Sequence, residues 1–115
     1  MTQHSDNPLG GPAETNNTGR PEEYAGYVHE QTYGTIASRN YIWGSYAWNM
    51  FDLGSGTCND GDVQRVNTKG LVTYDRKTKK DAFYFYKANW SSEPVTYITD
   101  RRYTNRAYAT VDVKV

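Results

Sequence analysis

Residues 41–48 read Tyr-Ile-Trp-Gly-Ser-Tyr-Ala-Trp, and this nearly unbroken run of apolar and aromatic side chains decides the fold class. A strand with one wet face alternates apolar and polar residues, whereas a strand of a parallel sheet is covered on both faces and reads as a continuous apolar run. The run therefore predicts a strand covered on both faces, as in a barrel or a doubly wound sheet.

A helix is expected before this strand. Pro21-Glu22-Glu23 is typical of a helix start, because proline loses no useful N–H at the first helical position and acids favour the positive end of the helix dipole. Apolar residues at spacings of three and four extend the helix to about Ser38 and predict one packed face. The members of this face are Tyr24, Tyr27, Val28, Thr32, Thr35 and Ile36.

A second helix is expected over 79–90. Thr78 with Asp81 three residues on resembles a capping box, with Asp in the usual Glu place. Its predicted buried stripe consists of Ala82, Phe83, Tyr86 and Trp90. A helix, a buried strand, a long loop and a helix in succession indicate an α/β fold, with one and a half units of a βα barrel or doubly wound sheet.

The long loop of this pattern covers residues 49–69 and is rich in Gly, Asn and Asp. Structureless loops of that length are uncommon in compact domains and are more often functional than not. A short extended piece is expected after it, over Gly70–Asp75.

The chain changes character near Glu93. Val95–Thr99 reads as one strand, and Ala109–Val115 alternates apolar and polar residues, which is typical of a strand with one wet face. Because two strands do not make a stable sheet in water, we expect them to be the first strands of a truncated β-domain.

Composition excludes several function classes. The formal net charge is zero, which gives no electrostatic footprint for nucleic acid. No apolar run approaches the ~18 residues of a membrane span. Cys58 is the single cysteine, so an internal disulfide is excluded and a structural zinc site lacks its other ligands. We expect no nucleic-acid or membrane partner, no metal site and no cofactor.

The apolar content also bears on whether the chain folds alone. Leu, Ile, Val and Phe supply 17 of 115 residues, under the roughly 20% that usually marks a chain with its own interior. Zero net charge and 15% aromatic residues nevertheless oppose disorder. We expect a folded segment of something larger.

Two stretches resemble the end of the catalytic domain in glycoside hydrolase family 2, most closely its β-galactosidases. They are Trp43-Gly-Ser-Tyr-Ala-Trp-Asn-Met-Phe-Asp52 and residues 67–90, which begin Asn-Thr-Lys-Gly-Leu-Val-Thr-Tyr-Asp-Arg and end in Trp90. Gln3-His4-Ser5 and Pro21-Glu-Glu-Tyr24 also look like the segment after the seventh barrel strand.

This resemblance implies an α/β fold with two parts. Residues 1–92 would be the C-terminal portion of a (β/α)8 TIM barrel, with helix seven at Pro21–Ser38, strand eight at Tyr41–Trp48 and helix eight at Lys79–Trp90. Residues 93–115 would begin the immunoglobulin-like β-sandwich that follows the barrel, truncated after its first strands.

The resemblance further implies a retaining glycoside hydrolase that acts on terminal β-galactosides. Such enzymes use two carboxylates about 5 Å apart. By resemblance both catalytic glutamates lie outside this chain, so we expect no catalytic residue within it and no activity of the chain alone. The sequence leaves open the compartment of the parent enzyme and whether it is a homo-oligomer.

Two alternatives stay open. A β-glucuronidase of the same family is the closest rival, and the galactosidase is ahead of it mainly through residues 69–90. A non-catalytic carbohydrate-binding module is the alternative of another class. The amphipathic helices speak against it, because stand-alone modules of that kind are usually closed β-sandwiches.

The residues expected to contact a carbohydrate substrate are Trp48, Asn67, Lys69, Asp52 and His4. Trp48 ends the expected strand, at the end of a barrel where active sites are built, and its indole suits the C–H face of a pyranose. The Asn67 amide and Lys69 ammonium can bind hydroxyls or a carboxylate. A similar Asn-x-Lys pair recognises the sugar carboxylate in the family's β-glucuronidases. Many galactosidase-like sequences carry the pair as well, so it does not decide the substrate. Asp52 either orients neighbours at the barrel mouth or caps the next turn, and His4 lines the pocket by resemblance.

Overall fold

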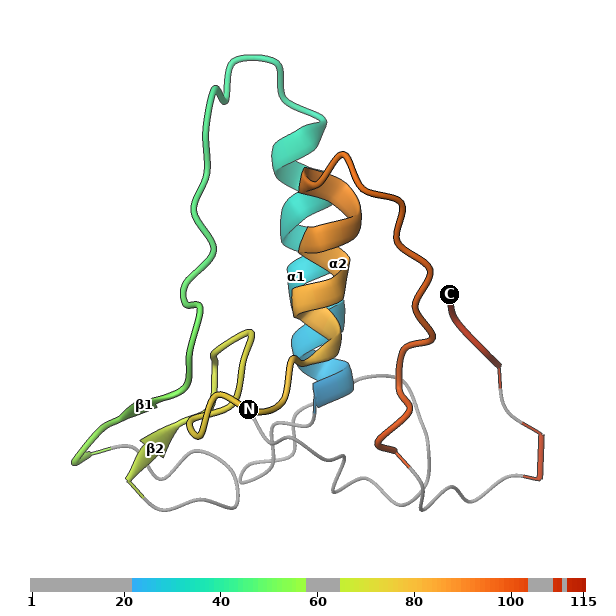
Figure 1. The fold of residues 1–115 in the computed structure, drawn as a ribbon. Coiled ribbons are helices and arrows are strands. Elements are labelled where there is room, and N and C mark those ends of the chain that lie inside the picture. The colour runs from blue at the N-terminus through green and yellow to red at the C-terminus, as the bar shows by residue number, and fades with distance from the viewer. Residues whose placement is uncertain (1–21, 58–64, 104–108, 111) are drawn as a thin grey trace.

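The computed structural model describes residues 22–57, 65–103, 109–110 and 112–115. Its elements are α1 (Glu22–Ala37), β1 (Leu53–Gly54), β2 (Val66–Asn67) and α2 (Asp81–Trp90). The two helices lie side by side and run in the same direction, with β1 and β2 near their N-terminal ends (Figure 1). The described residues thus form a small α/β arrangement of two helices and one two-stranded sheet.

The helix α1 has the predicted bounds to within one residue at the described start and end. Its predicted packed face is wrong in part: Tyr24, Val28 and Ile36 are partly buried, but Tyr27 is half exposed, and Thr32 and Thr35 are exposed. Hydroxyl-bearing threonines tolerate water, and the Thr35 hydroxyl donates to the Gln31 carbonyl of its own helix.

The face that α1 turns toward α2 is instead marked by Ala25, His29 and Tyr33. These residues are four apart, so they lie on one side of the helix. Ala25 is buried, and the rings of His29 and Tyr33 meet the Tyr86 ring of α2 edge to face, with centroids 5.3 and 6.2 Å apart.

The core between the helices is small and aromatic. Leu71, Ala82 and Tyr86 are buried at its centre, and the partly buried residues packed against them are Tyr33, Ala47, Phe83 and Phe85. The predicted stripe of α2 is therefore confirmed for Ala82 and Tyr86, while Trp90 is half exposed at the helix end.

The predicted capping box of α2 is wrong. Lys80 is the N-cap residue and its side chain makes no capping bond. A carboxylate of the other helix instead caps the start of α2, because Glu22 Oε1 accepts a hydrogen bond from the Asp81 backbone N–H at 2.7 Å. Thr78 closes a turn instead, with its backbone N–H donating to the Thr73 hydroxyl at 3.1 Å.

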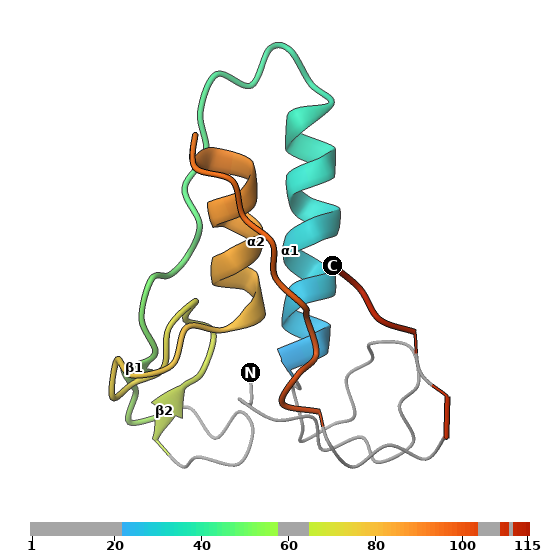
Figure 2. The ribbon, with the colours of Figure 1, turned by 45° about the vertical axis from the view of Figure 1, so that its right-hand side comes forward.

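The run that decided the fold class is extended but is not a paired strand. It descends from the end of α1, antiparallel to both helices (Figure 2). Trp43 and Tyr46 are 99% and 100% exposed, so the prediction of a strand covered on both faces is wrong for the described chain. Among the described residues, no backbone segment pairs with residues 43–48, and of their side chains only Ala47 packs against the core.

The predicted long loop contains a short β-ladder. β1 pairs antiparallel with β2, with Leu53 opposite Asn67 and Gly54 opposite Val66. The extended piece expected at Gly70–Asp75 is confirmed at Val72, which forms isolated bridges to Phe51 in parallel and to Lys79 in antiparallel register.

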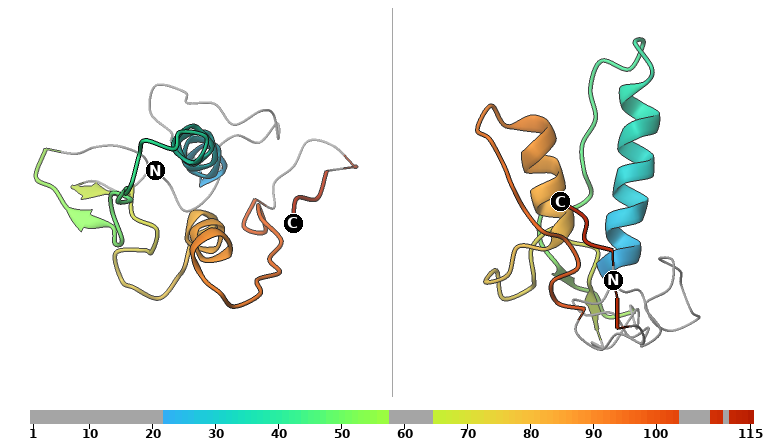
Figure 3. Two further views of the ribbon diagram at one scale, coloured as in Figure 1. Left: turned by 90° about the horizontal axis from the view of Figure 1, so that it is seen from above. Right: turned by 90° about the vertical axis from the view of Figure 1, so that its right-hand side faces the viewer.

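The two strands predicted after Glu93 are absent from the described residues. One backbone hydrogen bond joins them, from the Thr99 N–H to the Lys114 carbonyl at 3.0 Å. The segment after α2 runs back along that helix (Figure 3), where Tyr97 stacks on Tyr84 with ring centroids 3.8 Å apart. A sheet needs further strands to persist in water, and the described residues supply none.

Candidate functional site

The residues predicted to contact sugar gather around the segment that follows Trp48. Three backbone hydrogen bonds of 2.9 Å tie residues 49–52 to residues 71–72: Leu71 N–H to the Asn49 carbonyl, Val72 N–H to the Met50 carbonyl, and Asp52 N–H to the Val72 carbonyl. This ladder brings the end of the aromatic run beside the chain that leaves β2. Residues 48–52 and 67–70 therefore form one candidate site.

Trp48 stands at the open edge of this site. Its indole is 76% exposed, and the peptide bond that joins it to Asn49 is cis. It borders a hollow of about 210 Å³ whose other walls include His29, Tyr86 and Trp90. His29 Nδ1 lies 3.0 Å from the Tyr86 hydroxyl, and burial lowers the pKa of His29. The hollow is thus aromatic and uncharged at neutral pH, which suits the C–H face of a sugar.

Asn67 and Lys69 lie where β2 ends. The Asn67 Oδ1 accepts a hydrogen bond from the Lys69 backbone N–H at 3.0 Å, so the amide closes a tight turn around Thr68. Both residues are partly exposed, while Thr68 between them is buried. The Asn67 amide and the backbone that carries the Lys69 side chain are thereby held on one ordered turn.

Asp52 lies behind this turn and is almost fully buried. Its Oδ1 accepts from the Gly70 N–H at 2.8 Å and from the Lys80 ammonium at 2.7 Å. The Asp52 and Lys80 side chains are 1% and 3% exposed. Of the two roles that the sequence left open for Asp52, the geometry matches the orientation of neighbours.

Gly70 is required by the close approach of two backbones. A Cβ at this position would lie 2.1 Å from the Asp52 nitrogen and 2.3 Å from the Phe51 carbonyl carbon. Both are far inside van der Waals contact, so only glycine fits without movement of the backbone.

The position of His4, metal binding and membrane-spanning helices were further points of the sequence analysis. His4 lies outside the described residues. Among residues 22–57, 65–103 and the last described stretch, no three His, Cys, Asp or Glu side chains are grouped to hold a metal ion. Neither described helix is long and apolar enough to cross a bilayer.

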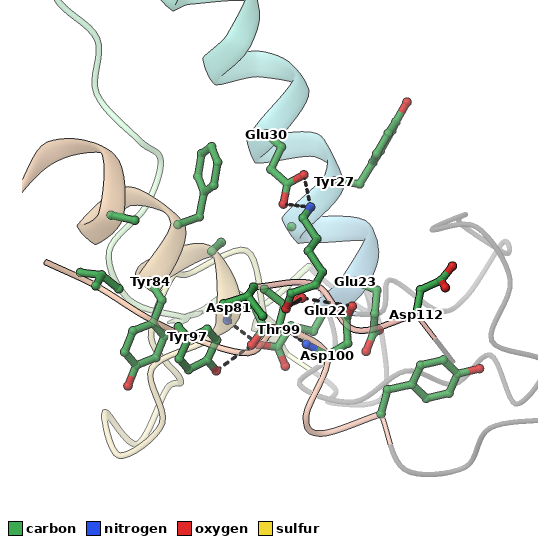
Figure 4. Close-up of a pocket in the computed structure, with 18 of the residues that line it drawn as sticks. Glu22, Glu23, Tyr27, Glu30, Asp81, Tyr84, Tyr97, Thr99, Asp100 and Asp112 are labelled. Atoms are coloured by element: carbon green, nitrogen blue, oxygen red, sulfur yellow. Dashed lines mark hydrogen bonds and ion pairs between the residues drawn. The ribbon is translucent and has the colours of Figure 1, made fainter. Parts of the chain in front are cut away.

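A second hollow, of about 620 Å³, lies at the N-terminal ends of the helices (Figure 4). Sequence reasoning missed it. Its walls come from α1, α2 and the segment after Glu93, and Figure 4 shows the carboxylates of Glu22, Asp81 and Asp100 close together at its base.

Arg102 bonds two of these carboxylates. Its guanidinium donates to both oxygens of Glu22, with Nε 2.7 Å from Oε2, and to Asp81 Oδ1 at 2.9 Å. The paired carboxylates raise the pKa of Arg102, while burial raises the pKa of Glu22. Glu22 and Arg102 are 80 positions apart in the sequence, so no local pattern signals the contact.

Glu23 is a further acid that lines this hollow. Its Oε2 is buried and has no hydrogen-bond partner among the described residues. Burial, followed by the nearby Asp100, Glu22 and Asp81 charges, raises the pKa of Glu23 from 4.5 to about 7.

Known proteins similar to this chain are glycosidases. No family model matches the chain. A β-glucuronidase of Bacteroides fragilis is 49% identical over 83 residues, which cover 71% of this chain and 12% of that protein. A protein of Formosa agariphila, provisionally named a β-glucuronidase, is 32% identical over 127 aligned positions, which cover 90% of this chain and 15% of that protein.

Solved structures similar to this chain are likewise glycosidases. An FMN-binding β-glucuronidase from Facaelibacterium prausnitzii L2-6 superposes with a TM-score of 0.67 at 42% identity, over 82% of this chain and 15% of that one. A protein of Bacteroides fragilis provisionally named a β-galactosidase superposes with a TM-score of 0.73 at 45% identity, over 86% of this chain and 15% of that one.

The similarity is thus to a segment of glycosidases. The chain spans 12–15% of the length of these four relatives. The expected resemblance to glycoside hydrolases is confirmed at that level, and the names of the relatives divide between the two substrates that the sequence left open.

Proposed function

We propose that this chain is part of a β-glycosidase and forms one wall of its sugar pocket, and that the sugar is a β-glucuronide. The observation that carries the proposal is the ordered turn of Asn67 and Lys69 beside the segment that follows Trp48. A lysine ammonium and an amide donor together can bind a sugar carboxylate by charge-assisted hydrogen bonds. The exposed Trp48 indole would take the C–H face of the same ring.

A barrel context accounts for the uncovered aromatic run. Residues 43–48 have no backbone partner among the described residues, and Trp43 and Tyr46 are open to solvent. In a parallel barrel, two flanking strands would satisfy this backbone, while the outer helices and the side chains of the barrel interior would cover the rings on its two faces. The helices that run parallel to each other and antiparallel to the run support the same assignment (Figure 2). We therefore assign residues 1–92 to a (β/α)8 barrel of glycoside hydrolase family 2 and residues 93–115 to the β-sandwich after it.

A terminal β-galactoside is the second candidate substrate. The solved structure provisionally named a β-galactosidase is 45% identical to this chain with a TM-score of 0.73. A neutral sugar needs no carboxylate partner, so in that case Asn67 and Lys69 would bind hydroxyls.

Catalysis itself is assigned to carboxylates outside this chain. Retaining glycosidases need a nucleophile and an acid/base about 5 Å apart. The described acids Glu22 and Asp81 are both bonded to Arg102 and line the larger hollow, whereas Trp48 lines the smaller one. We expect the chain alone to hydrolyse no glycoside.

A hybrid enzyme tests the proposal. The segment of the Bacteroides fragilis β-glucuronidase that matches this chain is replaced by this chain, and hydrolysis of 4-nitrophenyl β-D-glucuronide and β-D-galactoside is measured beside the unaltered host. We expect the hybrid to hydrolyse the glucuronide in preference to the galactoside. A folded hybrid with the reverse preference would support the galactoside, and a folded hybrid inactive on both would contradict the glycosidase assignment. Tight glycan binding by the chain without hydrolysis in the hybrid would favour a binding module.

A further inference from the structure

Lys80 holds the backbone that carries Lys69. Its ammonium donates to the Thr68 carbonyl at 2.9 Å and to Asp52 Oδ1 at 2.7 Å. The side chain is 3% exposed. Burial lowers the pKa of Lys80, and the bond to Asp52 opposes this shift. A buried ammonium that donates hydrogen bonds to one carboxylate and one carbonyl fixes the positions of these two groups relative to each other.

The chain is anchored on both sides of Lys69. Before it, the Thr68 carbonyl is bonded to Lys80. After it, the Gly70 N–H is bonded to Asp52, which is the partner of Lys80. Thr68 and Gly70 are both buried, whereas Lys69 between them is partly exposed. The Asp52–Lys80 pair therefore determines where the Lys69 side chain leaves the backbone.

We infer that Lys80 is a positioning residue for Lys69 in the recognition of the substrate carboxylate, and that it acts through Asp52 and the Thr68 carbonyl. The inference rests on the proposed function. Lys80 itself is shielded from the site by the turn that it holds.

The alternative to a positioning role is that the Asp52–Lys80 ion pair only stabilises the fold. Removing one member of a buried pair leaves an uncompensated charge and can unfold a protein, whereas replacing both members by neutral groups is often tolerated. The test therefore uses two changes in the hybrid enzyme, Lys80→Met and the double substitution Asp52→Asn with Lys80→Met. The amide oxygen introduced by Asp52→Asn would retain the bond to Gly70, so that the double variant loses chiefly the Thr68 anchor.

Lys79→Met is the matched control, because Lys79 is exposed and its ammonium lies over the Phe83 ring at 4.9 Å.

We expect the double variant to raise KM for the glucuronide about 10- to 100-fold, the effect of a small misplacement of a binding group. Hydrolysis of a neutral β-glycoside and the kcat for the glucuronide should change far less, and Lys79→Met should change neither. Equal losses on charged and neutral substrates would overturn the inference, because they indicate a general structural role. An unchanged KM in a folded double variant would overturn it as well.

A double-mutant cycle with Lys69 separates the positioning role from the proposed function. If Lys80 acts through Lys69, then the Lys80 substitution has little further effect once Lys69→Met is present, whereas independent effects add. Additive losses would overturn the positioning role and leave the proposed function intact. A hybrid that shows no glucuronide hydrolysis before any substitution would overturn the proposed function and, with it, the inference.

Discussion

At the scale of single residues, some positions of the candidate site have no room for a larger residue. Gly70 is the clearest, since a Cβ there would meet the Asp52 nitrogen at 2.1 Å. Gly54 in β1 offers a matched control, because an added Cβ would meet nothing within 4 Å.

We expect Gly70→Ala to destabilise the hybrid enzyme by about 1–3 kcal/mol, the usual cost of an overpacked site, and to lower glucuronide hydrolysis by moving Lys69. Gly54→Ala should leave both properties nearly unchanged. Thermal unfolding and steady-state kinetics of the two variants measure this difference. Equal behaviour of the two alanine variants would show that the close approach at Gly70 is not maintained in the enzyme.

Some residues of the candidate site can be predicted from the sequence, and Lys80 cannot. Residue type and a resemblance in sequence single out Trp48, Asn67 and Lys69, which precede in sequence the two segments, 49–52 and 71–72, that the backbone ladder joins. Neither signal singles out Lys80, because nothing in the run Lys77-Thr-Lys-Lys80 tells a buried ammonium from its exposed neighbours. Its role follows only from the contact with Asp52, 28 positions away.

At the scale of elements, the helix bounds and most of the α2 stripe were predictable, whereas the packed face of α1 was predictable only in part. The acidic start at Glu22-Glu23 and the length of the periodic pattern reproduce α1. Its packed face differs from the apolar stripe because Ala25 is small enough for close contact, and because His29 finds an aromatic partner in Tyr86. The cap of α2 comes from Glu22, which local sequence does not reveal.

The Arg102 ion cluster is the strongest link between the helices and the segment after Glu93. We expect Arg102→Met to destabilise the hybrid enzyme by about 3–5 kcal/mol, because it leaves the buried Glu22 and Asp81 carboxylates without their cation. Arg101→Met is the control: its guanidinium is exposed and lies over the Tyr97 ring at 4.5 Å, an interaction of about 0.5–1 kcal/mol. The midpoint of thermal unfolding should fall much further for Arg102→Met, and similar shifts would contradict the cluster's role.

At the scale of the whole molecule, the described chain has a small aromatic core and a large uncovered aromatic surface. Leu71, Ala82 and Tyr86 are buried at the centre of the core, whereas Trp43, Tyr46 and Trp48 are open. The α/β class was predictable from the succession of a helix, an extended run, a long loop and a helix, whereas the covered strand predicted at residues 41–48 is not present in the described chain. The solvent exposure of this run was not predictable from its composition, because residue type does not show which other segments lie beside it.

The isolated 115-residue chain should consequently be poorly soluble or molten. We expect strong binding of a hydrophobic dye such as ANS, a far-UV circular dichroism spectrum with helix, and a broad thermal transition. A sharp cooperative transition with dispersed amide NMR signals would contradict this expectation, because it would show that the aromatic run needs no cover.

The most direct test of the central claim is the ratio of kcat/KM for the glucuronide to kcat/KM for the galactoside, measured in the hybrid enzyme before and after Lys69→Met. If Lys69 binds the sugar carboxylate, the substitution lowers the ratio about 10- to 100-fold, which corresponds to the about 1.5–3 kcal/mol of a hydrogen bond to a charged group. If the ratio is unchanged while the variant stays folded, then Lys69 does not recognise a carboxylate and the assignment of a β-glucuronide substrate is wrong.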